Sequence, residues 1–155
     1  LECIPFFGWY LIKADMIGVN RSAGGRSLLK MAKQAREEVQ RGRQLIIFPE
    51  GTRRPVDAPP DYKAGVGLIY AGCDVPCIPV ALNSGLFWPR RTFMRYPGTM
   101  VVEFLDPLPP GLPRDEFLKR IETVIEDATN RLVEAGRVEQ AKLFGRVPSS
   151  PSAKT

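Results

Sequence analysis

A short apolar run that breaks into a charged turn constrains the fold of this chain more than any other stretch. Residues 44–48 end in four large apolar side chains, which predicts a buried strand. Pro49 and Gly51 then interrupt the run, and both disfavour continuation of a sheet ladder. Because open α/β sheets bind ligands beyond the carboxyl ends of their strands, the break predicts an anion site that includes Arg53. A plain polar turn with a surface ion pair between Glu50 and Arg53 accounts for the same residues and stays open.

A helix is expected immediately before this strand. Within residues 22–43, apolar side chains recur at steps of three and four residues, which indicates one buried helical stripe. A further short strand is expected at residues 16–21, so the order is strand, helix, strand. Such a crossover implies parallel strands. The predicted fold class is therefore α/β, with a mostly parallel sheet flanked by helices.

The remainder of the chain alternates in the same way. A short apolar helix is expected at residues 66–71, and its free N–H groups and the preceding Lys63 would favour an anion. Strands are expected at residues 75–82 and 99–105. A second amphipathic helix is expected at residues 114–135, where Gly136 can end it.

Composition and net charge limit the kinds of partner and the kinds of site that this chain can have. The 155 residues suit one domain, and a net charge of +5 favours anionic partners. No apolar run is long enough to span a bilayer. The three cysteines form no zinc set and are expected to be small core residues in a reducing compartment. The chain has no histidine, which excludes His-dependent triads and a His general base within these residues.

Residues 86–97 interleave aromatic and arginine side chains. This composition suits either single-stranded nucleic acid or an anionic bilayer surface. Together with the motifs that follow, it favours the bilayer, and no nucleic-acid partner is expected.

Several segments resemble one enzyme family. Residues 48–53, Phe-Pro-Glu-Gly-Thr-Arg, resemble the glycerol-phosphate-binding motif of the 1-acylglycerol-3-phosphate acyltransferase family. The apolar opening at residues 4–9 is similar to the stretch downstream of that family's catalytic motif. Arg21 matches a phosphate-binding arginine, although Asn20 stands where an Asp is usual. Tyr62 to Gly65 is also similar to the family pattern, and residues 75–80, Val-Pro-x-x-Pro-Val, resemble its fourth motif.

The resemblance implies a function in phospholipid biosynthesis. Enzymes of the family transfer an acyl group from acyl-CoA or acyl-ACP, as co-substrate, to lysophosphatidic acid (1-acylglycerol-3-phosphate), and the product is phosphatidic acid. The implied substrate-binding residues are Arg21, Glu50, Gly51, Thr52, Arg53 and Lys63. The implied residues of an acyl-donor or substrate pocket are Val75, Pro76 and Pro79. The resemblance implies no metal and no cofactor.

The family's catalytic base is a His paired with an Asp five positions later, and no residue of this chain matches it. The missing initial Met and the opening inside a family segment lead us to expect an N-terminally truncated enzyme without activity alone. We expect an acyltransferase domain over residues 1–143 and a disordered tail over residues 144–155. The expected location is the membrane, at its cytoplasmic face. A non-catalytic module that binds anionic lipid or phosphate is the alternative.

Overall fold

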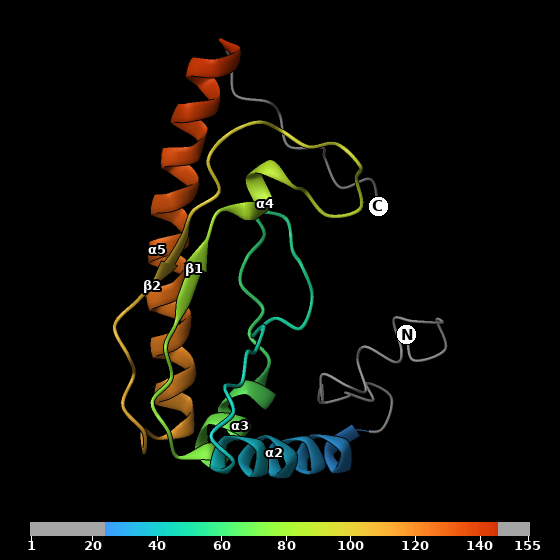
Figure 1. Cartoon of the computed structure of the whole chain (residues 1–155), viewed down its shortest axis with the longest axis vertical. Coiled ribbons are helices and arrows are strands. Elements are labelled where there is room, and N and C mark those ends of the chain that lie inside the picture. The colour runs from blue at the N-terminus through green and yellow to red at the C-terminus, as the bar shows by residue number, and fades with distance from the viewer. Residues whose placement is uncertain (1–23, 146–155) are drawn as a thin grey trace.

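The structure, a computed structural model, describes residues 24–145 and their arrangement around one long helix (Figure 1). The predictions for the apolar opening, the strand at residues 16–21, Arg21 and most of the tail lie outside the described residues. The described elements are α2 (Gly24–Gln40), α3 (Ala64–Cys73), β1 (Val80–Leu82), α4 (Ser84–Phe87), β2 (Val102–Phe104) and α5 (Arg114–Phe144). In Figure 1, α5 stands upright beside both strands, and α2 and α3 lie together at its lower end.

The helices agree with the sequence prediction, although their bounds differ. The apolar stripe of α2 packs on α3, where Ala32 and Ala35 meet Ile69. Helix α5 runs through Gly136, which was expected to end it, and continues to Phe144. Gly136 is buried in the helix, and a Cβ there would lie only 2.8 Å from Leu86 Cδ2. This glycine therefore allows close packing against the α4 segment, and α5 ends instead at Gly145, whose φ is +66°.

The main core lies where α3 crosses the first turns of α5. The rings of Tyr70 and Phe117 stack with their centroids 3.6 Å apart and their planes nearly parallel. The Tyr70 hydroxyl donates to the Pro109 carbonyl and accepts a hydrogen bond from the Leu112 N–H. Because both polar bonds and the ring face are used, Tyr70 fixes the turn before α5 as well as the helix pair.

The sheet differs from the prediction. Within residues 24–145 it has two short strands, and β1 pairs with β2 in antiparallel register, Val80 opposite Phe104. Residues 44–48 form no strand, and Ile46 is 83% exposed. An apolar run becomes a buried strand only where a neighbouring strand takes its backbone hydrogen bonds, and none pairs with residues 44–48 in the described part of the chain. The predicted parallel sheet is therefore not seen among the described residues.

The proline-containing segment forms a strand only after its second proline. Residues 75–79 precede β1, and only an isolated bridge between Cys77 and Leu108 extends the pairing. Pro79 is fully buried, and its carbonyl accepts a hydrogen bond from the Leu105 N–H at 2.9 Å. A proline has no N–H for a ladder, which explains why the strand is shorter than expected.

One face of the sheet is covered and the other is open. Ala81 is completely buried among Ala128 and Leu132 of α5. Glu103 points to the same helix, where Arg131 Nη2 lies 2.9 Å from its Oε1. The opposite face of the two strands exposes the large apolar side chains of Leu82, Val102 and Phe104.

The two cysteines in the described region are half-buried free thiols. Burial raises the pKa of both Cys73 and Cys77 above the ordinary thiol value. A thiol whose pKa is raised is less reactive, which agrees with a packing role.

Substitution of Phe117 tests the core described above. Phe117 has no exposed surface, so we expect Phe117→Ala to lower the free energy of unfolding by about 3–5 kcal/mol. Phe104→Ala is the matched control, because Phe104 is 75% exposed. Its change should stay within about 0.5 kcal/mol. Urea unfolding followed by circular dichroism measures both, and equal losses would contradict this core.

Candidate functional site: a charged loop before helix α3

The predicted anion site lies on a loop, residues 49–63, that we call the charged loop. Its two ends are joined, because the Lys63 N–H donates to the Pro49 carbonyl at 2.9 Å. Near its start the Gly51 N–H donates to the Phe48 carbonyl at 3.0 Å. Gly51 has a φ of +66°, a left-handed conformation that a residue with a Cβ adopts at a cost. The loop is therefore a closed turn structure that leads directly into α3.

Two carboxylates hold two of the cations on this loop. Asp61 Oδ2 lies 3.1 Å from Arg54 Nη1 and 2.5 Å from Lys63 Nζ. Glu50 Oε1 accepts a hydrogen bond from the Asp61 N–H at 3.1 Å and lies 3.6 Å from Arg54 Nε. The hydrogen bond from Lys63 lowers the pKa of Asp61, with smaller contributions from the charges of Lys63 and Arg54. Arg54 and Lys63 are therefore neutralised in place by Glu50 and Asp61.

Arg53 differs from its neighbour Arg54. Its side chain is exposed and forms no ion pair within the described part of the chain. Its guanidinium carbon lies 6.0 Å from the centroid of the Trp88 ring, and that of Arg95 lies 3.8 Å from the same ring. Arg53 thus retains its hydrogen-bonding capacity for a ligand, whereas the charge of Arg54 is used within the loop.

A tyrosine connects the charged loop to α5. The Tyr62 hydroxyl donates to Glu126 Oε1 at 3.0 Å. Burial raises the pKa of the Tyr62 hydroxyl, and the charge of Glu126 raises it further. Burial likewise raises the pKa of the Glu126 carboxyl, which the hydrogen bond from Tyr62 opposes and the charges of Glu50 and Glu122 reinforce. This pair fixes the segment that carries Lys63 against the long helix.

The predicted site residues are placed unequally. Glu50, Gly51, Thr52, Arg53 and Lys63 all belong to the charged loop, and Thr52 is exposed beside Arg53. Arg21 lies outside the described residues. The three residues assigned to a second pocket separate in the structure: Val75 and Pro76 are exposed, whereas Pro79 is buried.

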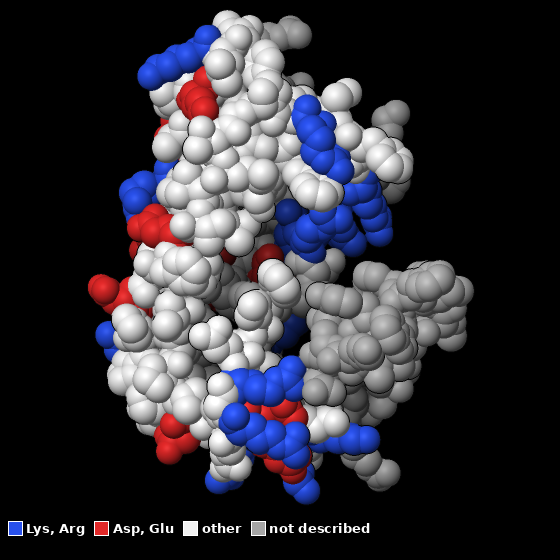
Figure 2. Space-filling view, in the orientation of Figure 1, with Lys and Arg blue, Asp and Glu red and all other residues white. Residues whose placement is uncertain are grey.

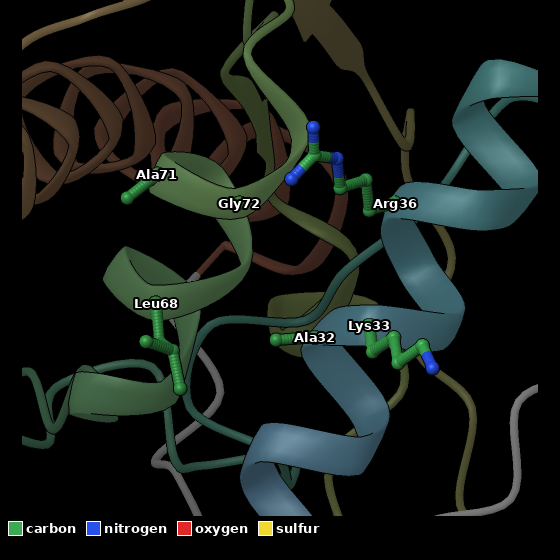
Figure 3. A pocket seen from close by; sticks show the side chains of 6 residues that line it. All are labelled: Ala32, Lys33, Arg36, Leu68, Ala71 and Gly72. Carbon is green, nitrogen blue, oxygen red and sulfur yellow. The ribbon is translucent and has the colours of Figure 1, made fainter.

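A hollow of about 390 Å³ lies between α2 and α3 (Figure 3). Its lining residues are Ala32, Lys33, Arg36, Leu68, Ala71 and Gly72. Figure 3 shows the Arg36 side chain directed toward the C-terminal end of α3, near Gly72, and the Lys33 side chain directed away from α3. The hollow thus lies toward the C-terminal end of α3, whereas Lys63 lies at its N-terminal end. None of the predicted site residues lines it.

The sequence prediction omitted several residues that shape the site. Arg54 and Asp61 were not assigned, although Arg54 follows the motif directly and Asp61 stands two positions before Lys63. Alternating positive and negative residues near a predicted site are the sequence pattern that indicates such ion pairs. The Tyr62–Glu126 bond and the approach of Trp88 join residues far apart in sequence, and no local pattern indicates them.

Comparisons with known proteins show the family of this chain. The sequence profile of the family described as "Acyltransferase" matches residues 1–83, which is more than half of the chain. The chain therefore belongs to the acyltransferase family, and the resemblance seen in the sequence is confirmed.

Two relatives with the same description are similar to this chain. The 1-acyl-sn-glycerol-3-phosphate acyltransferase of Pseudomonas aeruginosa is 37% identical over 99 residues, which are 64% of this chain and 38% of that protein. The protein with the same description from Saccharomyces cerevisiae is 28% identical over 143 residues, 88% of this chain and 46% of that one. The chain therefore spans half or less of the length of these relatives.

The crystal structure of the 1-acyl-sn-glycerophosphate (LPA) acyltransferase PlsC from Thermotoga maritima has a similar fold. The TM-score is 0.70 at 24% identity, over 85% of this chain and 53% of that one. This likeness shows that the described elements adopt the fold of that protein.

The described residues contain neither a membrane-spanning helix nor a cluster of metal ligands. No helix among residues 24–145 combines the length and the apolar character that crossing a membrane requires. In the same residues no three Cys, Asp or Glu side chains gather as metal ligands do.

The Tyr62–Glu126 pair predicts a pH-dependent stability. Because the pKa of Glu126 is raised above its ordinary value of 4.5, its contribution to stability is present below that pH and is lost as the pH rises through the raised value. Glu126→Gln keeps an acceptor for Tyr62 and removes the charge. We therefore expect the stability of the variant relative to the wild type to increase as the pH rises above 4.5.

Urea unfolding at several pH values measures this difference. Glu134→Gln is the control, because Glu134 is an exposed carboxylate on the same helix. A difference between Glu126→Gln and wild type that does not change with pH would contradict the burial of this carboxyl.

Proposed function

We propose that this chain is part of a 1-acylglycerol-3-phosphate acyltransferase of phospholipid biosynthesis. The enzyme transfers an acyl group from acyl-CoA or acyl-ACP to lysophosphatidic acid and forms phosphatidic acid. Membership of the acyltransferase family supports this proposal, as do the names of the Pseudomonas and yeast relatives. The charged loop and its exposed arginine supply the physical reason.

The reaction joins an alcohol to a thioester carbon. The acceptor hydroxyl oxygen attacks the thioester carbonyl, the carbon–sulfur bond breaks, and the thiol leaves with a proton. A base takes the proton of the hydroxyl. A clamp on the acceptor phosphate orients that hydroxyl, which turns a chance encounter into a positioned attack. We assign the clamp to this chain.

The single observation that carries the assignment is the contrast between Arg53 and Arg54. Arg54 pairs with Asp61 and Glu50, whereas Arg53 is exposed, two positions after a left-handed glycine. We assign direct phosphate binding to Arg53, assisted by Arg21, the Thr52 hydroxyl and the backbone near Gly51. Lys63 assists as well, because its exposed ammonium shares the single Asp61 carboxylate with Arg54 and keeps further N–H donors for an anion. Glu50 orients the loop, because its carboxylate accepts the Asp61 N–H and faces Arg54.

The base is assigned to a His-x-x-x-x-Asp motif upstream of these residues, because the chain contains no histidine. We assign Val75, Pro76 and Pro79 to the acyl-donor side of the site. The proposed acyltransferase domain covers residues 1–143, with the remaining residues as a tail. The proposed location is the cytoplasmic face of a membrane.

Arg53→Ala tests the phosphate clamp. Each hydrogen bond to a charged group contributes about 1.5–3 kcal/mol, so we expect affinity for a monomeric short-chain lysophosphatidate to fall by about tenfold or more. Lysophosphatidylcholine, whose phosphate carries a choline, should bind weakly to wild type and variant alike. Isothermal titration calorimetry on the 155-residue chain measures the affinities.

Arg120→Ala is the control for net charge, because Arg120 is an exposed arginine on α5. Wild-type affinity in Arg53→Ala would contradict the clamp. Thiol release from acyl-CoA by the chain extended upstream through a His-x-x-x-x-Asp motif tests the reaction itself. Lysophosphatidate binding without any such release would favour the alternative, a non-catalytic module for anionic lipid or phosphate.

A further inference from the structure

A second surface of the chain combines arginine and exposed aromatic side chains. It is the segment between α4 and β2, residues 88–95, which we call the arginine loop. Figure 2 shows Lys and Arg side chains gathered on the side of the molecule where this segment runs in Figure 1. Between Asp74 and Glu103 the sequence contains no acidic residue. The positive charge of the arginine loop is therefore not balanced by its own segment.

The apolar residues of this loop point to solvent. Phe93 is 100% exposed, and Met94 and Trp88 are exposed beside it. An exposed phenylalanine is not stabilised by the fold, and three large apolar side chains within seven residues form a contact surface. Arg90 and Arg91 are exposed as well and form no ion pair within the described residues.

The arginine loop is also preformed. Its ends are joined by a hydrogen bond from the Tyr96 N–H to the Phe87 carbonyl at 2.9 Å. Phe87 is buried, and the backbone of Gly98 packs so closely on its ring that a Cβ there would lie 2.1 Å from Cε1. Inside the loop, Arg95 Nη1 donates to the Thr92 and Met94 carbonyls at 3.1 Å each. Ordering this loop on a partner therefore costs little conformational entropy.

We propose that the arginine loop is the surface by which this chain docks on an anionic lipid bilayer. Phe93 and Met94 insert among the acyl chains, Trp88 lies at the head-group level, and Arg90 and Arg91 contact lipid phosphates. Tryptophan and arginine are favoured at this depth, because each has an apolar body and a polar end. The inference rests on the proposed function only for the choice of a lipid partner.

The position of the loop links docking to the charged loop. Trp88 lies under the Arg95 guanidinium at 3.8 Å and near that of Arg53 at 6.0 Å. A lipid surface that reaches Trp88 would thus lie next to the arginine that we assign to the acceptor phosphate. An acceptor whose acyl chain stays in the bilayer would present its head group at that level.

Vesicle co-sedimentation of the 155-residue chain tests the proposal, with phosphatidylcholine vesicles that contain or lack phosphatidylglycerol. We expect binding that requires phosphatidylglycerol and weakens with added salt. The double variant Arg90→Gln/Arg91→Gln should bind about 30-fold more weakly, because it loses two charges at the lipid surface. Phe93→Ser should bind about tenfold more weakly.

Matched controls change the same residue types elsewhere. Lys119→Gln/Arg120→Gln removes two exposed positive charges from α5, and Phe104→Ser removes an exposed phenylalanine from β2. Both controls should bind vesicles within about twofold of wild type. In a Trp9→Phe background Trp88 is the single tryptophan, and vesicles with brominated acyl chains should quench its fluorescence.

Equal losses in the loop variants and their controls would overturn the proposal, since net charge alone would then explain binding. Failure of the wild type to bind anionic vesicles would also overturn it. So would an Arg90→Gln/Arg91→Gln variant that loses affinity for a single-stranded oligonucleotide but binds vesicles like the wild type. Monomeric lysophosphatidate, titrated in parallel, separates this result from the proposed function. The loop variants should bind it like wild type, because their substitutions lie outside the charged loop.

Discussion

Carboxylates of the chain itself decide which of its cations face a ligand. Asp61 holds both Arg54 and Lys63, and Glu50 holds the backbone of Asp61 and the other side of Arg54. Three cations within eleven residues would otherwise repel one another. The two acids remove most of that repulsion and leave one guanidinium, that of Arg53, without an ion pair among the described residues. These ion pairs therefore determine which cation of the candidate site is left to face a ligand.

The long helix α5 holds the charged loop in position. It stacks Phe117 on Tyr70 at one end, covers Ala81 in its middle, and receives the Tyr62 hydroxyl at Glu126. The segment that carries Lys63 is thus fixed by a helix whose sequence lies more than fifty residues away. A shift of α5 relative to α3 would move the charged loop, although no residue of α5 belongs to that loop.

The sequence predicted the helices well. It placed both observed strands within longer predicted runs, residues 75–82 and 99–105, and it was wrong about a strand at residues 44–48. The stripes of α2 and α5 are local patterns, so their existence could be read directly, and only the ends moved. Residues 44–48 had the composition of a buried strand, but a strand also needs a partner, which no local pattern specifies. Gly136 resembled a helix end because its tertiary role, close contact with Leu86, is not encoded in its neighbours.

The candidate site was predictable to a similar extent. The motif at residues 48–53 located the loop, and Lys63 was correctly placed before a helix. The sequence could not tell which of two adjacent arginines faces solvent, because that depends on Asp61, seven positions further along. The approach of Trp88 to Arg53 likewise requires the folded chain.

The half-covered sheet has a practical consequence for handling this polypeptide. An exposed apolar strip lies on the two strands and consists of Leu82, Val102 and Phe104. Neither strand pairs with a further strand among the described residues. Strand edges next to such a strip are templates for pairing between molecules. Concentrated preparations of this chain should therefore self-associate through β1 and β2, and detergent or a lipid additive should suppress that association.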